Sequence, residues 1–148
     1  MIDRIVGANE IDIRLIVHEL SAQNRAEAKA MGLSHETIIE GLTLLAQRGY
    51  SESIFIDGNP VAAFGLNTDP TGNFGDTWFI ATDDFFKLGK QGIRFSRDVL
   101  ASFREVSGLP LRSTSHSPLS QAPKWFLALG FEEDLKTSVD GRRVFIYK

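Results

Sequence analysis

The sequence has 148 residues, of which 43% are hydrophobic and 24% charged, and this length and composition predict one globular domain covering residues 1–148. A net charge of −3 argues against a general nucleic-acid binder, and no apolar run approaches the roughly 20 residues that a membrane-spanning helix needs. With no cysteine and three scattered histidines, we expect no disulfide, no thiolate nucleophile and no metal site.

The N-terminal third of the chain predicts one strand followed by two helices. Residues 2–6 alternate apolar and polar side chains, as a half-buried strand does. Apolar residues at helical spacing predict a helix over residues 10–20, which we expect to continue through an alanine-rich stretch to Ala30. Ser34 is a suitable cap for a second helix, and Gly49 is predicted to end it in the left-handed conformation.

A hairpin and a further strand are predicted in the middle of the chain. The β-rich runs 53–56 and 61–64 flank Asp57-Gly-Asn-Pro60, and Asp-Gly supplies the positive φ angles of a tight turn. Residues 67–75 are rich in glycine, asparagine, aspartate and proline and predict a loop. The β-rich run 77–81 then predicts the next strand.

The stretch from Gly75 to Val106 reads as a strand, a glycine-punctuated basic loop and a helix. Backbone amides of such a loop and the unpaired first-turn amides of the helix converge where the helix dipole is positive. This arrangement is typical of backbones that bind phosphate groups, and it predicts an anion site at the start of the helix.

The remainder of the chain predicts one strand, one helix and a closing hairpin. Residues 111–115 form the candidate strand, and Pro118, capped by Ser117, suits the first turn of a helix that stops at Gly130. Strands over residues 131–136 and 142–147 would form the last hairpin.

This order of elements, β-α-α-β-β-β-α-β-α-β-β, resembles the GCN5-related N-acetyltransferases (GNAT). The aromatic-rich helix that ends in Gly-Phe, within Trp125–Phe131, strengthens the resemblance. The resemblance implies an α+β GNAT fold, with a mixed, mostly antiparallel sheet flanked by helices. It also implies a splay between strands 77–81 and 111–115, and acetyl-CoA or CoA as the cofactor.

A closer likeness is to the small GNAT-like proteins of short-tailed bacteriophages that are linked to assembly of internal virion proteins. The passages that carry it are Trp78–Asp83, Lys87–Lys90, Thr114–His116 and Asp140–Phe145. This likeness implies a phage-encoded protein whose partners are other phage proteins or host proteins. Since the first residues lack an export signal, we expect it in the host cytoplasm or associated with the virion.

In the acetyltransferases a loop of pattern Gln/Arg-x-x-Gly-x-Gly/Ala holds the pyrophosphate of acetyl-CoA. The nearest frame here is Lys87–Gly92, which keeps a cation and the final glycine but places Lys90 at the central glycine. Two interpretations stay open: a CoA site, or a solvated basic turn balanced by Asp83 and Asp84. The cofactor-binding residues that the resemblance implies are Ile80, Ala81, Thr82, Lys87, Gly89, Lys90, Gln91, Gly92 and Ile93.

Catalytic groups are less evident than the framework. Many acetyltransferases place a proton-donating tyrosine four residues before the glycine of the Gly-Phe pair, where this chain has Phe126. Tyr50 and Tyr147 lie elsewhere, and Asp76 is a weak candidate for the general base. Of the neighbouring Phe85 and Phe86, we expect one ring in the core and the other partly exposed, near a pocket or a partner.

These observations favour a GNAT-derived assembly or interaction protein with weak or no catalysis. The alternative is an acetyl-CoA-dependent N-acetyltransferase that acts on a small amine or a protein. A third possibility, an adaptor that binds host protein through the edge of its last hairpin, is not separable from the first by sequence.

Overall fold

The computed structural model describes residues 1–148, which form seven strands and six helices. In chain order these are β1 (Ile2–Val6), α1 (Glu10–His18), α2 (Ala22–Met31), α3 (His35–Arg48), β2 (Tyr50–Ile56), β3 (Asn59–Thr68), β4 (Gly75–Ala81), α4 (Asp83–Phe86), α5 (Lys90–Ser107), β5 (Leu111–Ser115), α6 (Gln121–Leu129), β6 (Glu132–Glu133) and β7 (Arg143–Tyr147). The structure has two helices more than the sequence predicted, since α1 and α2 are separate helices and the single-turn helix α4 was not predicted. No helix combines the length and the hydropathy that crossing a bilayer requires.

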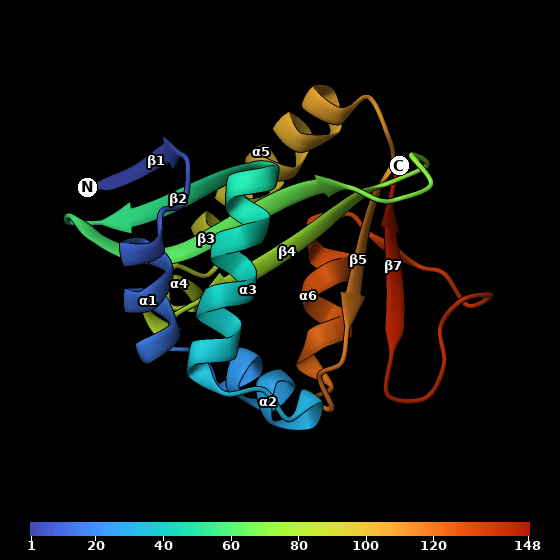
Figure 1. Ribbon diagram of the computed structural model, residues 1–148, viewed down its shortest axis with the longest axis horizontal. Helices are drawn as coiled ribbons and strands as arrows, with labels where there is room; N and C mark the ends of the chain where they lie inside the picture. Colours follow the sequence, from blue (N-terminus) through green and yellow to red (C-terminus); the bar gives the residue numbers. More distant parts are fainter.

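The seven strands form one sheet in the order β1-β2-β3-β4-β5-β7-β6 (Figure 1). Every neighbouring pair is antiparallel except β4 and β5, which run parallel. These two strands pair only at Gly75 with Leu111 and at Asp76 with Arg112, and they diverge beyond that point. The predicted mixed sheet and its splay are therefore confirmed.

Helices cover both faces of the sheet, as Figure 1 shows. The larger core lies between the sheet and α4, α5 and α6, and its largest fully buried side chains are Phe85, Phe103 and Phe145. The smaller core lies under α1 and α3 and contains Ile13 and Ile16. On that second face α1 and α3 cover β2, β3 and β4, and the part formed by β5 and β7 stays uncovered.

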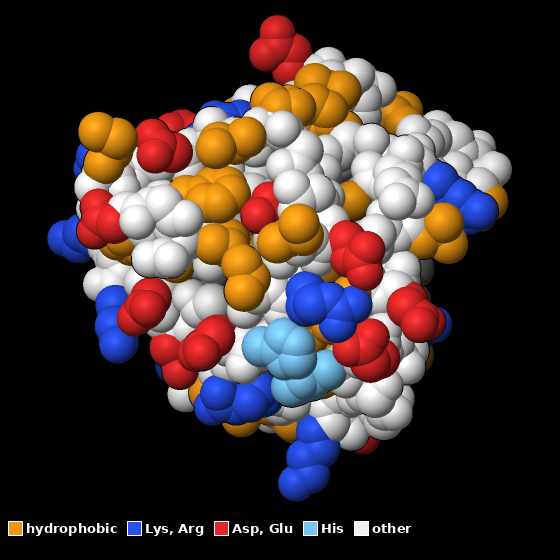
Figure 2. Space-filling view, turned by 60° about the vertical axis from the view of Figure 1, so that its left-hand side comes forward, with side chains coloured by type: hydrophobic (Ala, Val, Ile, Leu, Met, Phe, Trp, Pro, Cys, Tyr) orange, Lys and Arg blue, Asp and Glu red, His pale blue; other side chains and the backbone are white.

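Polar contacts tie α1 to the start of α3. Arg14 donates hydrogen bonds to Glu36, at 2.8 Å, and to Glu10, at 3.1 Å. The rings of His18 and His35 meet edge to face, with centroids 5.8 Å apart. Figure 2 shows histidine side chains together on this side of the molecule, between acidic and basic groups. In Figure 1, α2 lies below α1 and α3, at the open end of the gap between β4 and β5.

Both predicted hairpins are confirmed. Asp57 and Gly58 have φ angles of 49° and 81°, and they connect two strands that are longer than the sequence predicted. At the other end of the chain β6 pairs with β7 in antiparallel register. This β6 strand is only two residues long, because the chain turns away at Asp134, whose carboxylate accepts the amide N–H of Lys136.

The predicted continuation of the first helix to Ala30 is wrong. The chain leaves the helix after His18, and Leu20 forms an antiparallel bridge with Thr82 at the end of β4. The Ser21 hydroxyl then caps α2 by accepting the amide N–H of Asn24 at 3.2 Å. Pairing with β4 therefore outweighs the helix propensity of the alanine-rich stretch.

The predicted left-handed end of the helix at Gly49 is also wrong. Gly49 has a φ angle of −136° and leads into β2 in an extended conformation. A Cβ atom at this position would lie 2.2 Å from the carbonyl oxygen of Leu66. Glycine is therefore required for close approach of β3.

The helix predicted from Pro118 begins instead at Gln121. The Ser117 hydroxyl accepts the amide N–H of Leu119 at 3.2 Å, which stabilises a local turn in place of the first helical turn. The predicted end of this helix is confirmed, since Gly130 adopts a left-handed conformation with φ 103°.

Candidate functional site

The gap between β4 and β5 is bordered by backbone groups that no neighbouring strand covers. On β4, the carbonyl of Phe79 and both backbone groups of Ala81 point into the gap, and on the other side so does the amide of His116, just after β5. Buried backbone groups of this kind need hydrogen-bond partners. Their partners come from α2 and from the residue before it.

Asn24 of α2 bonds to the edge of β4 with both ends of its amide. Its Oδ1 accepts the N–H of Ala81 at 3.0 Å, and its Nδ2 donates to the carbonyl of Phe79 at 3.4 Å. The backbone N–H of Ser21 donates to the carbonyl of Ala81 at 2.8 Å. Asn24 is only 8% exposed, so these contacts are shielded from water.

Glu27 makes the corresponding contact on the β5 side. It follows Asn24 by three residues on α2, and its Oε2 accepts the amide N–H of His116 at 2.5 Å. No cationic side chain lies within ion-pair distance of this carboxylate. Helix α2 therefore bridges the gap, with Asn24 on β4 and Glu27 on the residue after β5.

A cavity of about 290 Å³ lies beneath α2 and between the two diverging strands. We call it the α2 cleft. Its walls come from α2, α3, β4, β5 and α6, and its larger apolar lining residues include Met31, Leu33, Ile38, Leu42, Trp78 and Phe126. Glu27 and His116 supply the titratable groups of this lining, whose other polar residues are uncharged. A carboxylate in such surroundings is a candidate proton acceptor.

Burial raises the pKa of Glu27, and the hydrogen bond from the His116 amide opposes the rise only in part. A raised folded-state pKa means that the ionised carboxylate destabilises the fold relative to a neutral group. This penalty is absent below the ordinary pKa of 4.5 and develops as the pH rises through the folded-state pKa.

Glu27→Gln should therefore raise the thermal midpoint by a few degrees at pH 7, because glutamine keeps an acceptor for the His116 amide without the charge. Thermal unfolding of both proteins between pH 4 and pH 8 measures this effect. The difference between them should shrink toward zero as the pH falls to 4. A midpoint difference that does not change with pH would contradict the assignment.

The predicted cofactor-binding residues lie together where β4 passes into α5. Ile80 and Ala81 end β4, and Thr82 precedes α4 with its hydroxyl buried and without a partner. Lys87, Gly89, Lys90 and Gln91 are exposed, Gly92 is buried, and Ile93 is half-buried against the larger core. Lys87 contacts Asp84 at 3.3 Å, whereas Asp83 accepts the amide N–H of Ala22 at 3.2 Å.

Most amides between Lys87 and Ile93 already donate to carbonyls of α4 or of the loop itself. Leu88 donates to Phe85 and Gly89 donates to Phe86, both at 3.1 Å, and Gln91 donates to Leu88 at 3.2 Å. The amides of Lys87 and Ile93 also have backbone acceptors. The amides of Lys90 and Gly92, at the start of α5, have no backbone acceptor, so they are the donors that this loop leaves free for an anion.

The final glycine of the loop serves packing. A Cβ atom on Gly92 would lie 3.2 Å from the carbonyl oxygen of Phe85 and 3.3 Å from the Cβ of Leu88. The glycine thus lets the first turn of α5 rest on Phe85, which is fully buried. Phe86 is half-buried, so the expected division between one core ring and one partly exposed ring is confirmed.

Aromatic rings fill the space between β4, α4 and α6. Trp125 stacks on Phe79, with centroids 5.5 Å apart, and meets Phe86 edge to face at 5.1 Å. Phe126 stacks on Phe145 at 4.4 Å and also lines the α2 cleft. A phenylalanine ring has no proton to donate, so this position provides packing and no acid.

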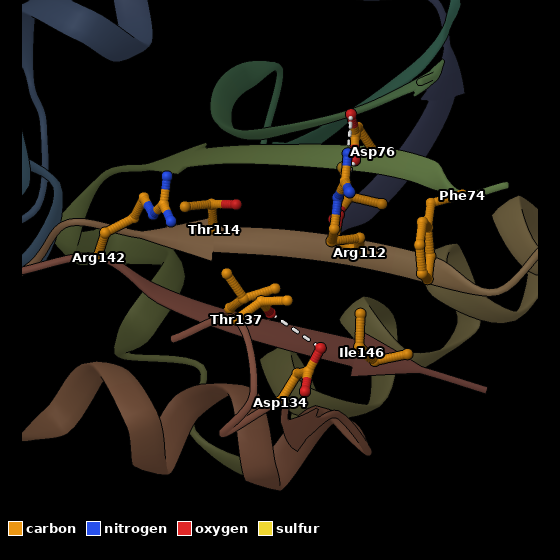
Figure 3. A pocket seen from close by; sticks show the side chains of 10 residues that line it. Phe74, Asp76, Arg112, Thr114, Asp134, Thr137, Arg142 and Ile146 are labelled. Atoms are coloured by element: carbon orange, nitrogen blue, oxygen red, sulfur yellow. Dashed lines mark hydrogen bonds and ion pairs between the residues drawn. The ribbon is translucent and has the colours of Figure 1, made fainter. Parts of the chain in front are cut away.

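Asp76 lies outside the α2 cleft, in a polar groove of about 550 Å³ on the uncovered face of β5 and β7 (Figure 3). Both of its oxygens accept from Arg112, at 2.7 and 3.0 Å. Arg112 also lies 3.6 Å from Asp69 and 4.9 Å from the ring centre of Phe74. The carboxylate of Asp76 is therefore held in an ion pair with Arg112, as a structural contact would be. No three His, Asp or Glu side chains are grouped to hold a metal ion.

Asn24 and Glu27 were not identified from the sequence. Their spacing of three residues predicts that they share a helix face, but many exposed helices carry such pairs. Only the divergence of β4 from β5 gives that face a partner. These two residues can therefore be identified only from the tertiary structure, since each contact joins residues more than fifty positions apart.

Solved structures similar to this one are acetyltransferases. The PaiA N-acetyltransferase from Thermoplasma acidophilum, in complex with coenzyme A, superposes with a TM-score of 0.73 at 13% identity, over 100% of this chain and 99% of that one. An aminoglycoside acetyltransferase in complex with coenzyme A gives 0.66 at 14% identity, over 97% and 93%. A GNAT-family acetyltransferase from Bacillus anthracis gives 0.68 at 8% identity, over 97% and 93%.

No family profile and no curated protein matches the sequence. At these identities the structural similarity establishes the fold and leaves the activity open. The protein has the GNAT fold, as the order of its elements predicted.

Proposed function

We propose that this protein acts by binding other proteins and turns over acetyl-CoA weakly or not at all. The observation that carries the proposal is the pair of hydrogen bonds from Asn24 to β4, because they fill the strand edge beside the gap. The phage virion-assembly setting is part of this proposal and rests on the sequence resemblance alone.

Two further features support a non-catalytic role. Between Lys87 and Ile93, five of the seven backbone amides already donate to carbonyls of α4 or of the loop itself, so few donors remain for pyrophosphate recognition. Phe126 stands where many acetyltransferases have a tyrosine and cannot protonate a departing thiolate. Pyrophosphate binding and protonation of the thiolate are therefore both weakened, although the arrangement of strands and helices is intact.

The edge of the molecule formed by β1 and α1 offers a surface for partners. Ile5 and Val6 of β1 and Ile11 and Leu15 of α1 are all about half exposed or more. On the side shown in Figure 2, hydrophobic side chains lie exposed among charged ones. Exposed apolar groups of this kind favour contacts with another protein surface.

Coenzyme A at 2 mM should leave the thermal midpoint of the protein unchanged. A ligand present at one hundred times its dissociation constant would add about 2.7 kcal/mol, which for a chain of this length is roughly 5–10 °C. Thermal unfolding with and without coenzyme A measures this, and acetyl-CoA with a panel of amines tests turnover by release of free thiol.

A variant with Lys87→Ala and Lys90→Ala is the matched control. A rise of several degrees that this double variant abolishes would contradict the proposal and establish a cofactor site at the start of α5. Amine-dependent thiol release at about 1 per second or faster, the rate of an ordinary enzyme, would contradict it independently, because binding alone produces no thiol.

A working N-acetyltransferase is the second candidate, and Glu27 is the observation that favours it. Glu27 lines a cleft whose walls are mostly hydrophobic, and burial raises the pKa of its carboxyl group, as suits a group that accepts a proton from an amine. The CoA complexes among the similar structures support the same candidate. If it is correct, amine-dependent thiol release should fall at least tenfold in Glu27→Gln.

A further inference from the structure

The contacts of Asn24 reproduce those of a neighbouring parallel strand. In a parallel ladder, one residue donates its N–H to the carbonyl before the residue opposite and accepts the N–H of the residue after it. The Asn24 amide does the same on either side of Ile80, donating to Phe79 and accepting from Ala81. A single side chain therefore takes the place of one strand residue.

Glu27 completes the substitution on the opposite side. Its carboxylate accepts the N–H of His116, which follows the end of β5 and has no strand beside it. The gap is thus an opening shaped for a strand, and side chains from one face of α2 supply hydrogen-bond partners to backbone groups on both of its edges. Figure 1 places α2 across the open end of the gap.

The hold of α2 on the rest of the protein is mainly polar. Asn24 is its only buried residue, and Ser21 is the buried cap before it. The remaining anchors are the Glu27 contact and a hydrogen bond of 3.2 Å from the Ala22 amide to Asp83. An element held by a few hydrogen bonds and little apolar packing opens at lower free energy than the core does.

We infer that α2 is an autoinhibitory latch that closes the gap between β4 and β5 against an extended, amide-bearing arm. With the latch closed, the carbonyl of Phe79 and the backbone N–H and carbonyl of Ala81 are bonded to Asn24 and Ser21, so they are unavailable to the amides of a pantetheine arm. When α2 swings away, the same groups become free, and the apolar lining of the α2 cleft becomes accessible. The inference rests on the proposed function, because it explains why a chain with this fold would not hold acetyl-CoA.

The test uses Asn24→Ala, the double variant Asn24→Ala with Glu27→Ala, and Gln23→Ala as the matched control on the same helix. Amide hydrogen exchange at Ala81 should become roughly tenfold faster in Asn24→Ala and stay unchanged in Gln23→Ala. Exchange at His116 should accelerate only in the double variant. Unchanged exchange in α5 verifies that each variant is folded.

Pantetheine, which has the amide arm without the nucleotide, is the binding probe. Titration calorimetry should detect binding at millimolar concentration to the double variant and none to the wild type or to Gln23→Ala. Equal binding to all three proteins would overturn the latch, and so would no binding to the double variant. Amine-dependent thiol release from acetyl-CoA by the wild type at about 1 per second or faster would overturn the proposed function, whereas exchange at Ala81 tests the latch separately.

Discussion

Replacing Arg4 with alanine should destabilise the fold by about 3 kcal/mol, because it leaves a buried carboxylate without its counter-ion. The Glu52 side chain is 1% exposed, and Arg4 of β1 forms a two-bond ion pair with it, one bond being 2.9 Å long. Arg4 also donates to the hydroxyl of Ser102 at 2.7 Å, which joins β1 to α5. Thermal unfolding should show a midpoint lower by roughly 6–12 °C.

Arg143→Ala is the matched control, since Arg143 makes a two-bond pair with Glu133 at the surface. Its removal should cost less than about 1 kcal/mol, because water solvates both groups. A second variant, Arg4→Met with Glu52→Leu, should recover much of the loss by removing both charges. Equal losses in Arg4→Ala and Arg143→Ala would contradict the role given to the buried pair.

The strands and hairpins could be predicted because their signals are local. Asp57-Gly58 determines its own turn through positive φ angles, and alternation along residues 2–6 marks a strand regardless of its neighbours. The order of these elements was sufficient to predict the GNAT fold. Local signals thus account for most of the architecture.

Features that depend on contacts between distant residues could not be predicted. The break between α1 and α2 depends on the bridge from Leu20 to Thr82, and the extended conformation of Gly49 depends on the Leu66 carbonyl. The pairing of Arg4 with Glu52 joins residues 48 positions apart. None of these contacts leaves a pattern in the neighbouring sequence.

The candidate site divides in the same way. A strand, a glycine loop and a helix could be predicted, and the residues from Ile80 to Ile93 do lie at that junction. Two features could be seen only once α2 and α4 were placed in space. The amides after α4 donate to backbone carbonyls of the chain itself, and Asn24 bonds to the open edge of β4. The sequence therefore predicted where the site lies but not which groups of the chain bond to its backbone.

Phe85→Ala should destabilise the fold by about 3–5 kcal/mol, the second of the two largest expected effects. The Phe85 ring is fully buried and lies within 6.3 Å, centroid to centroid, of Phe64, Phe79, Phe86 and Trp125. Gly92 packs against the same residue, so the loss of the ring also removes the support of the first turn of α5. Thermal unfolding measures the loss, and amide exchange at Leu88 and Gly89 should accelerate with it.

Phe86→Ala is the matched control, because the neighbouring ring is only half-buried and leaves a smaller cavity when removed. We expect it to lose less than half as much stability and to leave the exchange at Gly89 nearly unchanged. If the two variants lost the same stability, the cluster around Phe85 would not be what holds the loop. The internal hydrogen bonds of Leu88 and Gly89 would then have to be stable without support, and the loop's lack of free donors would be a property of its own backbone.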